Sequence, residues 1–330
     1  MKEHRLERCV SHADVDFVGE LKLSSLLGLL EQAAVEASTA VGFDPAWYTR
    51  ERRLWIVRRT RVERVAPVGG GDLLEVRTRV ADYRRARSLR SYDVTRHDRS
   101  AESKASAEHQ AAESTASAEQ QPAESTAPTD RRSALVARAT TDWVYCELTS
   151  GRPVSIPGEV QHAFAGPDLA PTLPRAAQVP PIGTSADAEL EVEVRPSDLD
   201  HLAHVNNAIY GSYLEDGAFA LFAARGWPLA RMLATGGALR ARWLDAEYLS
   251  DAGSGDRLVV RTSLVAGSID PSLEAPLGTV QLLQSIARSE SDRAPVQIMR
   301  ASSVWQWLAR PEVVGGRPAT VGDRLALRTQ

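Results

Sequence analysis

An internal duplication constrains the fold of this chain more than any other feature of its sequence. The segment VSHADVDFVGELKLSSLLGLLEQAAVEA, which begins at Val10, aligns without gaps on VRPSDLDHLAHVNNAIYGSYLEDGAFAL, which begins at Val194. The same offset of 184 residues places VERVAPVGGGDLLEVRTRV, from Val62, on AEYLSDAGSGDRLVVRTSL, from Ala246. One register kept over about seventy residues indicates duplicated domains, because the repeats of solenoid proteins are much shorter.

Each copy predicts one helix followed by several strands. In the first copy a short strand is expected near residues 6–10, and apolar residues at helical spacing predict a helix from about residue 24 to residue 41. Later segments alternate and are rich in β-branched or aromatic residues, which favours strands. They are LLEVRTRV, SLRSYDVT and ALVARATTDWVYCEL in the first copy, and RLVVRTSLV, VQLLQSIAR and SSVWQWLA in the second. This order predicts an α+β fold in which an antiparallel sheet wraps the helix.

Two stretches of unusual composition suggest the domain boundaries. In residues 97–132 the triplet AES recurs every 11 residues among Ala, Glu, Ser and Gln, which predicts a disordered or transiently helical insertion. A period of 11 can also mark a supercoiled helix, but these repeats lack an apolar seam. The Pro-rich residues 167–184 are the expected linker between an N-terminal domain, 1–166, and a C-terminal domain, 185–330.

Composition excludes several classes of protein. With 330 residues, 43% of them hydrophobic, and a formal net charge of -4, the chain has room for two folded domains and no excess charge that would favour nucleic acid. It contains no apolar run of eighteen residues and no signal-like N-terminus, so we expect a cytoplasmic protein without membrane contact. Cys9 and Cys146 are the only cysteines, and no Cys/His cluster has zinc-site spacing, so we expect reduced thiols and no metal.

The pattern D-x-x-x-H-V-N-N-x-x-Y in the second copy carries the candidate chemistry. Its polar members are Asp200, His204, Asn206, Asn207 and Tyr210. Asp and Asn ahead of a helix are also ordinary capping residues, so the pattern alone does not separate chemistry from capping. The first copy retains only the aspartate, as Asp16, and has Glu20, Lys22, Leu23 and Leu26 at the other positions. The fold therefore does not require those residues, which favours one working site in the second copy.

This motif resembles that of hotdog-fold thioesterases of the 4-hydroxybenzoyl-CoA type, and the duplication is similar to that of the acyl-ACP thioesterases. In the first copy, ELKLSSLLGLLEQAAVEA and TTDWVYCELTSGRP resemble the N-terminal half of the latter family. The resemblance implies two tandem hotdog domains, paired edge to edge as an intramolecular pseudo-dimer, with the active site at their interface. It also implies hydrolysis of acyl-ACP or acyl-CoA without cofactor or metal, and a place in fatty acid biosynthesis.

Thioester hydrolysis needs an activated water or a carboxylate nucleophile, and donors for the carbonyl oxygen. We expect Asp200 to act as general base or nucleophile and His204 to position water or share a proton. Asn206 and Asn207 lie near the expected helix start, where the dipole favours an oxyanion.

The resemblance also suggests two further candidate catalytic carboxylates. At one position, however, this chain departs from the family pattern. Glu215 matches the helix carboxylate of some hotdog enzymes, although Glu31 at the equivalent position favours a shared structural role equally. A strand or turn carboxylate of the family falls nearest to Asp251, with Glu247 next. Plant-type enzymes have an asparagine where this chain has Leu202, so that residue's role does not transfer.

Candidate substrate contacts are Tyr210 and a basic set formed by Arg58, Arg84 and Arg85. The arginines belong to the run DYRRARSLR and the Arg58-Arg59 pair, which can meet a CoA phosphate or an acidic carrier protein. A solvated surface explains the same charges.

Two other functions stay open at this stage. The chain can be a non-catalytic acyl-CoA-binding hotdog protein, or another enzyme acting on acyl thioesters, although the H-x-x-x-G-x-x-x-x-P start of dehydratases is absent. Acyl length, the carrier, and homodimerisation of the whole chain are not fixed by the sequence.

Overall fold

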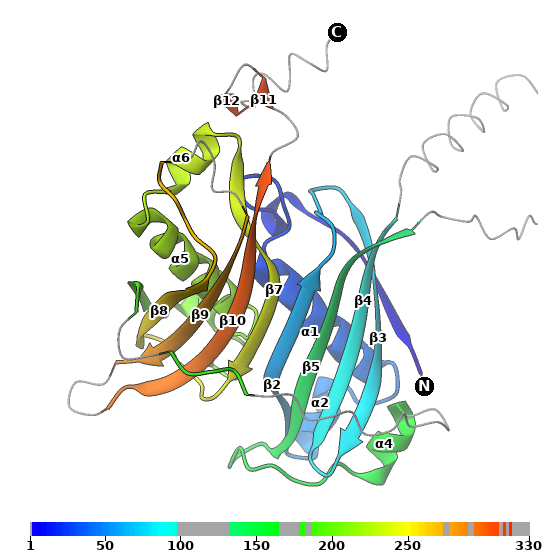
Figure 1. Cartoon of the computed structure of the whole chain (residues 1–330). Helices are drawn as coiled ribbons and strands as arrows, with labels where there is room; N and C mark the ends of the chain where they lie inside the picture. The colour runs from blue at the N-terminus through cyan, green and yellow to red at the C-terminus, as the bar shows by residue number, and fades with distance from the viewer. Residues whose placement is uncertain are drawn as a thin grey trace, which may run out of the picture.

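One large antiparallel sheet dominates the computed structural model of the chain (Figure 1). The structure describes residues 2–97, 133–164, 178–182, 186–272, 278–289, 294–309, 313–314 and 317–318. The predicted insertion therefore lies outside the described residues except for His97, and so does most of the predicted linker. Within these ranges no helix is both long and apolar enough to cross a membrane.

The two copies share the order strand, 3-10 helix, long helix, short helix and four strands. The first comprises β1 (His4–Cys9), η1 (His12–Asp14), α1 (Leu23–Thr39), α2 (Pro45–Arg50), β2 (Arg53–Arg64), β3 (Leu73–Arg84), β4 (Arg87–His97), β5 (Ser133–Glu147) and α4 (Gly158–Phe164). The second comprises β6 (Ala188–Glu193), η2 (Pro196–Asp198), α5 (Ile209–Ala224), α6 (Leu229–Ala234), β7 (Gly237–Tyr248), β8 (Arg257–Ala266), β9 (Thr279–Arg288) and β10 (Val296–Ala309). The short strands β11 (Val313–Val314) and β12 (Arg317–Pro318) pair with each other.

The ten main strands form a single sheet in the order β1-β3-β4-β5-β2-β7-β10-β9-β8-β6. The first copy occupies one half and the second copy the other, and the two halves meet where β2 pairs with β7. This seam consists of the antiparallel pairs from Arg59 opposite Glu247 to Glu63 opposite Trp243. The expected α+β class with a large antiparallel sheet is therefore confirmed.

Both long helices lie on the same side of the sheet, α1 behind the first half and α5 behind the second (Figure 1). Helix α1 buries eight apolar residues at helical spacing: Leu23, Leu26, Leu27, Leu29, Leu30, Ala33, Ala34 and Ala37. Its C-terminal end is closed by Ser38, whose hydroxyl donates to the carbonyl oxygen of Phe43. Asp44 then accepts the N–H of Trp47 and starts α2 with Pro45 at its first turn.

The sequence located the main helices and seven of the ten main strands but missed the two strands of the seam. Strands β2 and β7 carry several charged residues, and each has a register shift against a neighbouring strand, so neither shows clean alternation of apolar and polar residues. Strand β6 was also missed, because its alternating pattern AELEVE follows the Pro-rich segment directly.

We expect Leu26→Ala to lower the free energy of unfolding by about 2–5 kcal/mol, because Leu26 is 1% exposed in the core between α1 and the sheet. The matched control is Val35→Ala on the same helix, where the side chain is 44% exposed and little apolar surface is lost. Urea denaturation of both variants measures the difference. Equal losses in the two variants would contradict the packing described for α1.

Candidate active site

The loop between η2 and α5 holds the motif residues in a fixed turn. Asp200 donates its backbone N–H to the carbonyl oxygen of His204 (2.8 Å), and its carboxylate accepts the N–H groups of Leu202 (2.8 Å) and His204 (3.4 Å). In the first copy, Asp16 accepts the N–H groups of the equivalent residues, Val18 and Glu20. An aspartate is therefore kept in both copies because it closes this turn.

His204 pairs with Asp251, the residue that the sequence places nearest to the strand or turn carboxylate of the family. The Nε2 atom of His204 lies 3.2 Å from a carboxylate oxygen of Asp251, and both side chains are about half exposed. The backbone N–H of Val205 donates to the carbonyl oxygen of Ala252, which holds the two loops together. Glu247, the other carboxylate considered, lies on the opposite face of the sheet and pairs with Arg59 at 3.0 Å.

Asn206 connects the helix start to a carboxylate from the first copy. Its side-chain oxygen accepts the N–H of Ala208 at 2.8 Å, which forms an Asx turn directly before α5. Its side chain also interacts with Glu31 of α1, which lowers the pKa of that carboxyl. The larger effects of burial and of the nearby Asp200 charge raise it, so the net pKa of Glu31 is raised.

The helix carboxylate beside the motif is therefore Glu31 and not Glu215. Each long helix presents its glutamate to the loop of the other copy. Glu215, for which the sequence leaves a catalytic and a structural role open, therefore lies beside the first-copy loop and not beside Asp200. The signal was present in the sequence, since Glu31 and Glu215 are equivalent under the repeat. What the sequence did not contain was the packing of one copy against the other.

Glu215 belongs to a buried charge cluster around the first-copy loop. Arg64 donates to Glu20 at 2.9 Å, and Arg240 lies 2.8 Å from Asp16. Burial raises the pKa of Glu215 to about 7, although the charges of Arg64 and Arg240 oppose this. Arg240 is 1% exposed and also stacks over the ring of Phe17, so this side of the molecule is filled.

A small pocket, the inner pocket, lies between Glu31 and the second-copy helix start. Its lining is Leu27, Leu30, Glu31, Val57, Thr60, Thr141, Trp143, Asn207, Ala208 and Tyr248. The first copy supplies most of these residues, while Asn207 and Ala208 bring the start of α5. Tyr210, predicted to contact substrate, is not among them. It is 2% exposed and packs edge-on against Tyr213 and Tyr248, so its role here is packing.

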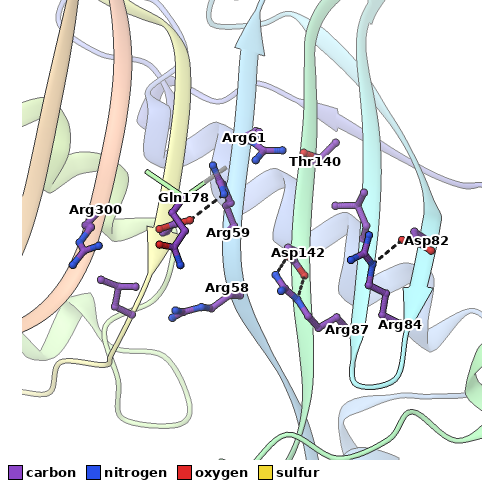
Figure 2. A pocket seen from close by; sticks show the side chains of 13 residues that line it. Arg58, Arg59, Arg61, Asp82, Arg84, Arg87, Thr140, Asp142, Gln178 and Arg300 are labelled. Atoms are coloured by element: carbon purple, nitrogen blue, oxygen red, sulfur yellow. Dashed lines mark hydrogen bonds and ion pairs between the residues drawn. The ribbon is translucent and has the colours of Figure 1, made fainter. Parts of the chain in front are cut away.

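A second depression, the outer groove, lies on the opposite face of the sheet over the seam (Figure 2). It has a volume of about 190 Å³. Its lining is Arg58, Arg59, Arg61, Asp82, Arg84, Arg87, Leu89, Thr140, Asp142, Gln178, Glu247, Leu249 and Arg300. The predicted residues Arg58 and Arg84 line it, but Arg85 does not, because its guanidinium turns to the hydroxyl of Ser155.

One group of side chains within the described residues has the composition of a metal site. Ligand atoms of Glu7, Glu75 and His97 all lie within 4.8 Å of one another. These residues line neither the inner pocket nor the outer groove, and Glu75 also pairs with Arg77. The absence of a cofactor and of a metal from the reaction stays a prediction.

Two family models match the chain, one on each copy. Residues 2–107 match the acyl-ACP thioesterase N-terminal domain, and residues 194–273 match the thioesterase-like superfamily. The resemblance to hotdog-fold thioesterases predicted from the sequence is thereby confirmed.

Two curated relatives are chloroplastic proteins of Arabidopsis thaliana, the acyl-acyl carrier protein thioesterases ATL3 and ATL2. They are 33% and 34% identical to this chain over 82 and 76 residues, which are 25% and 23% of the chain. These matches cover 43% and 40% of the relatives, so the chain spans less than half the length of either.

Solved structures match over nearly the whole chain. A putative oleoyl thioesterase from Lactobacillus plantarum has a TM-score of 0.65, with 94% of this chain and 98% of that one covered. The 12:0-ACP thioesterase from Umbellularia californica has a TM-score of 0.64, with 93% and 94% covered. Both are 16% identical to this chain, so the likeness establishes the fold.

We expect acidification to relieve a destabilising charge at Glu215. Its pKa is 4.5 in an unfolded chain and about 7 in the folded protein, so the folded protein binds more protons between these values. The contribution of Glu215 to the free energy of unfolding therefore falls as the pH rises from 4.5 to 7, and Glu215→Gln removes this dependence. Urea denaturation across that range measures it, with Glu63→Gln on an exposed position as control. A difference between wild type and Glu215→Gln that does not change with pH would contradict the assignment.

Proposed function

We propose that the protein hydrolyses acyl thioesters to a free acid and a thiol. The observation that carries the proposal is the meeting, beside the inner pocket, of the Asp200–Asn207 loop from one copy with Glu31 from the other. This arrangement supplies a carboxylate with a raised pKa, an amide that orients it, and a helix start. The family matches on both copies support the same reaction.

Glu31 is the general base in this proposal. It takes a proton from water, which attacks the thioester carbonyl, and its raised pKa improves proton acceptance near neutral pH. The start of α5 at Asn207 and Ala208 faces the same pocket, where backbone N–H groups and the helix dipole stabilise the developing oxyanion. His204, oriented by Asp251, lies at the exposed side of the loop and donates the proton that the departing thiolate needs.

Asp200 has two tasks in the proposed mechanism. Its carboxylate closes the loop through Leu202 and His204, and its charge raises the pKa of Glu31. This differs from the role of base or nucleophile expected from the sequence, because Asp16 makes the same loop contacts without His or Asn beside it.

The two copies form an intramolecular pseudo-dimer of hotdog domains with one working site. Under the repeat, Glu20 replaces His204 and Arg64 replaces Tyr248 at the first-copy loop, and Arg240 fills the space between them. We take the domains to be residues 1–166 and 185–330, joined by residues 167–184. Acyl-ACP is the proposed carrier substrate, since the N-terminal copy matches the acyl-ACP thioesterase domain, and acyl-CoA is the alternative.

We expect Glu31→Gln to lower kcat by about 100-fold or more, the loss typical of a general base, in a thiol-release assay with acyl-ACP and acyl-CoA. The matched control is Glu215→Gln, the equivalent position on the other helix, which should keep most of kcat. Thermal unfolding establishes that both variants fold. Equal losses in the two variants would give the helix glutamates a common structural role, and no thiol release by wild type from either carrier would reject the proposed reaction.

We expect Asp200→Asn to shift the pH dependence of kcat. The asparagine oxygen can still accept the N–H groups of Leu202 and His204, so the loop is retained while the charge is lost. Without that charge the pKa of Glu31 falls, and the acidic limb of the kcat profile moves to lower pH. Loss of activity at every pH in a folded Asp200→Asn protein would instead identify Asp200 as the base or nucleophile.

A further inference from the structure

The outer groove contains more positive than negative charge. Six arginines line it, Arg58, Arg59, Arg61, Arg84, Arg87 and Arg300, against three carboxylates, Asp82, Asp142 and Glu247. Four of the arginines have carboxylate partners: Arg59 and Arg61 bind Asp245, Arg84 binds Asp82, and Arg87 binds Asp142. Figure 2 shows Arg58, Arg59 and Arg61 on β2, Asp142 on β5, and Arg84 and Arg87 beside the β3–β4 hairpin.

Two arginines of the groove lack such a partner among the described residues. Arg58 donates to the backbone carbonyl oxygen of Tyr248, and no carboxylate contacts it there. Arg300 is partly exposed, but its Nε atom is buried and has no hydrogen-bond partner. A buried guanidinium donor without an acceptor is costly, so Arg300 favours an anion from outside the chain. Arg58 adds a positive charge that no carboxylate among the described residues neutralises.

The groove lies back to back with the inner pocket at the end of the seam. Pairing between β2 and β7 stops at Arg59 and Glu247, and the next residues are Arg58, at a register shift, and Tyr248. Tyr248 and Val57 line the inner pocket, whereas Arg58 and Leu249 line the outer groove. A single sheet layer therefore separates the two cavities, and the strands that separate them are no longer paired there.

We infer that the outer groove binds the phosphate of a phosphopantetheine arm, whose thioester end reaches the inner pocket past Arg58 and Tyr248. Guanidinium groups bind phosphate oxygens in a forked geometry, and a groove of about 190 Å³ accepts a phosphate or diphosphate but not a folded partner. CoA and acyl carrier protein both present their thiol on this arm. The inference rests on the proposed thioester hydrolysis.

The test compares two substrates that differ only in the phosphate, an acyl-4′-phosphopantetheine and the corresponding acyl-pantetheine. We expect wild type to prefer the phosphorylated substrate by about tenfold in kcat/KM, as loss of one charge-assisted contact predicts. Arg300→Gln should reduce this ratio towards one. Arg138→Gln, which removes an exposed arginine from β5 outside the groove, should keep it. A wild-type ratio of one, or an unchanged ratio in Arg300→Gln, would overturn the inference.

Failure of the proposed reaction is distinguishable from failure of this inference. If wild type hydrolyses neither substrate, titration calorimetry with 4′-phosphopantetheine decides: binding that is weakened in Arg300→Gln supports the groove, and no binding rejects it. Assays with acyl-CoA and with acyl-ACP then identify which carrier supplies the phosphate. The Arg300→Gln loss is expected with whichever carrier gives the higher kcat/KM in wild type, and a loss with neither carrier rejects the assignment.

Discussion

Five backbone pairs between β2 and β7 hold the two copies of this chain in one sheet, and the rest of the structure depends on them. Arg58 and Arg242, equivalent under the repeat, reinforce the seam from both sides. Arg58 donates to the carbonyl oxygen of Tyr248, and Arg242 donates to that of Val65. Because each link crosses to the other copy, the guanidinium groups satisfy backbone acceptors at both ends of the short paired region. The seam thereby fixes α1 and α5 side by side on one face of the sheet.

That placement gives each helix glutamate to the loop of the other copy, and the two resulting sites have diverged. At the first-copy loop, Arg64 and Arg240 neutralise Asp16 and Glu20, and the space is closed. At the second-copy loop no arginine performs this task within the described residues, and burial together with the nearby charge of Asp200 raises the pKa of Glu31. In a duplicated fold, stabilising ion pairs can replace the site of one copy, because the other copy keeps the uncompensated charge of its own site.

The repeat in the sequence was sufficient to predict the two long helices and the presence of an aspartate before each of them, but it did not show that these aspartates close a turn or that His204 pairs with Asp251. It was insufficient for β2 and β7, whose arginines and acidic residues face the outer groove and interrupt the apolar alternation that marks strands. The positions of Glu215 and Tyr210 were not predictable for a related reason. Helical spacing shows which residues share a face, but it does not show that α1 meets the second-copy loop or that Tyr210 turns into the aromatic core.

Comparison of the two loops separates the residues that the fold needs from those that chemistry needs. Asp16 and Asp200 accept the same backbone donors, so the aspartate follows from loop geometry. The residues that differ between copies, His204, Asn207 and Tyr248, are exposed on the loop or line the inner pocket. That pocket holds about 20 Å³, room for about one water, so an acyl chain must displace its lining. Because Leu27, Val57 and Trp143 of the first copy make up much of that lining, the proposed function makes the first copy the part of the chain that selects among acyl chains.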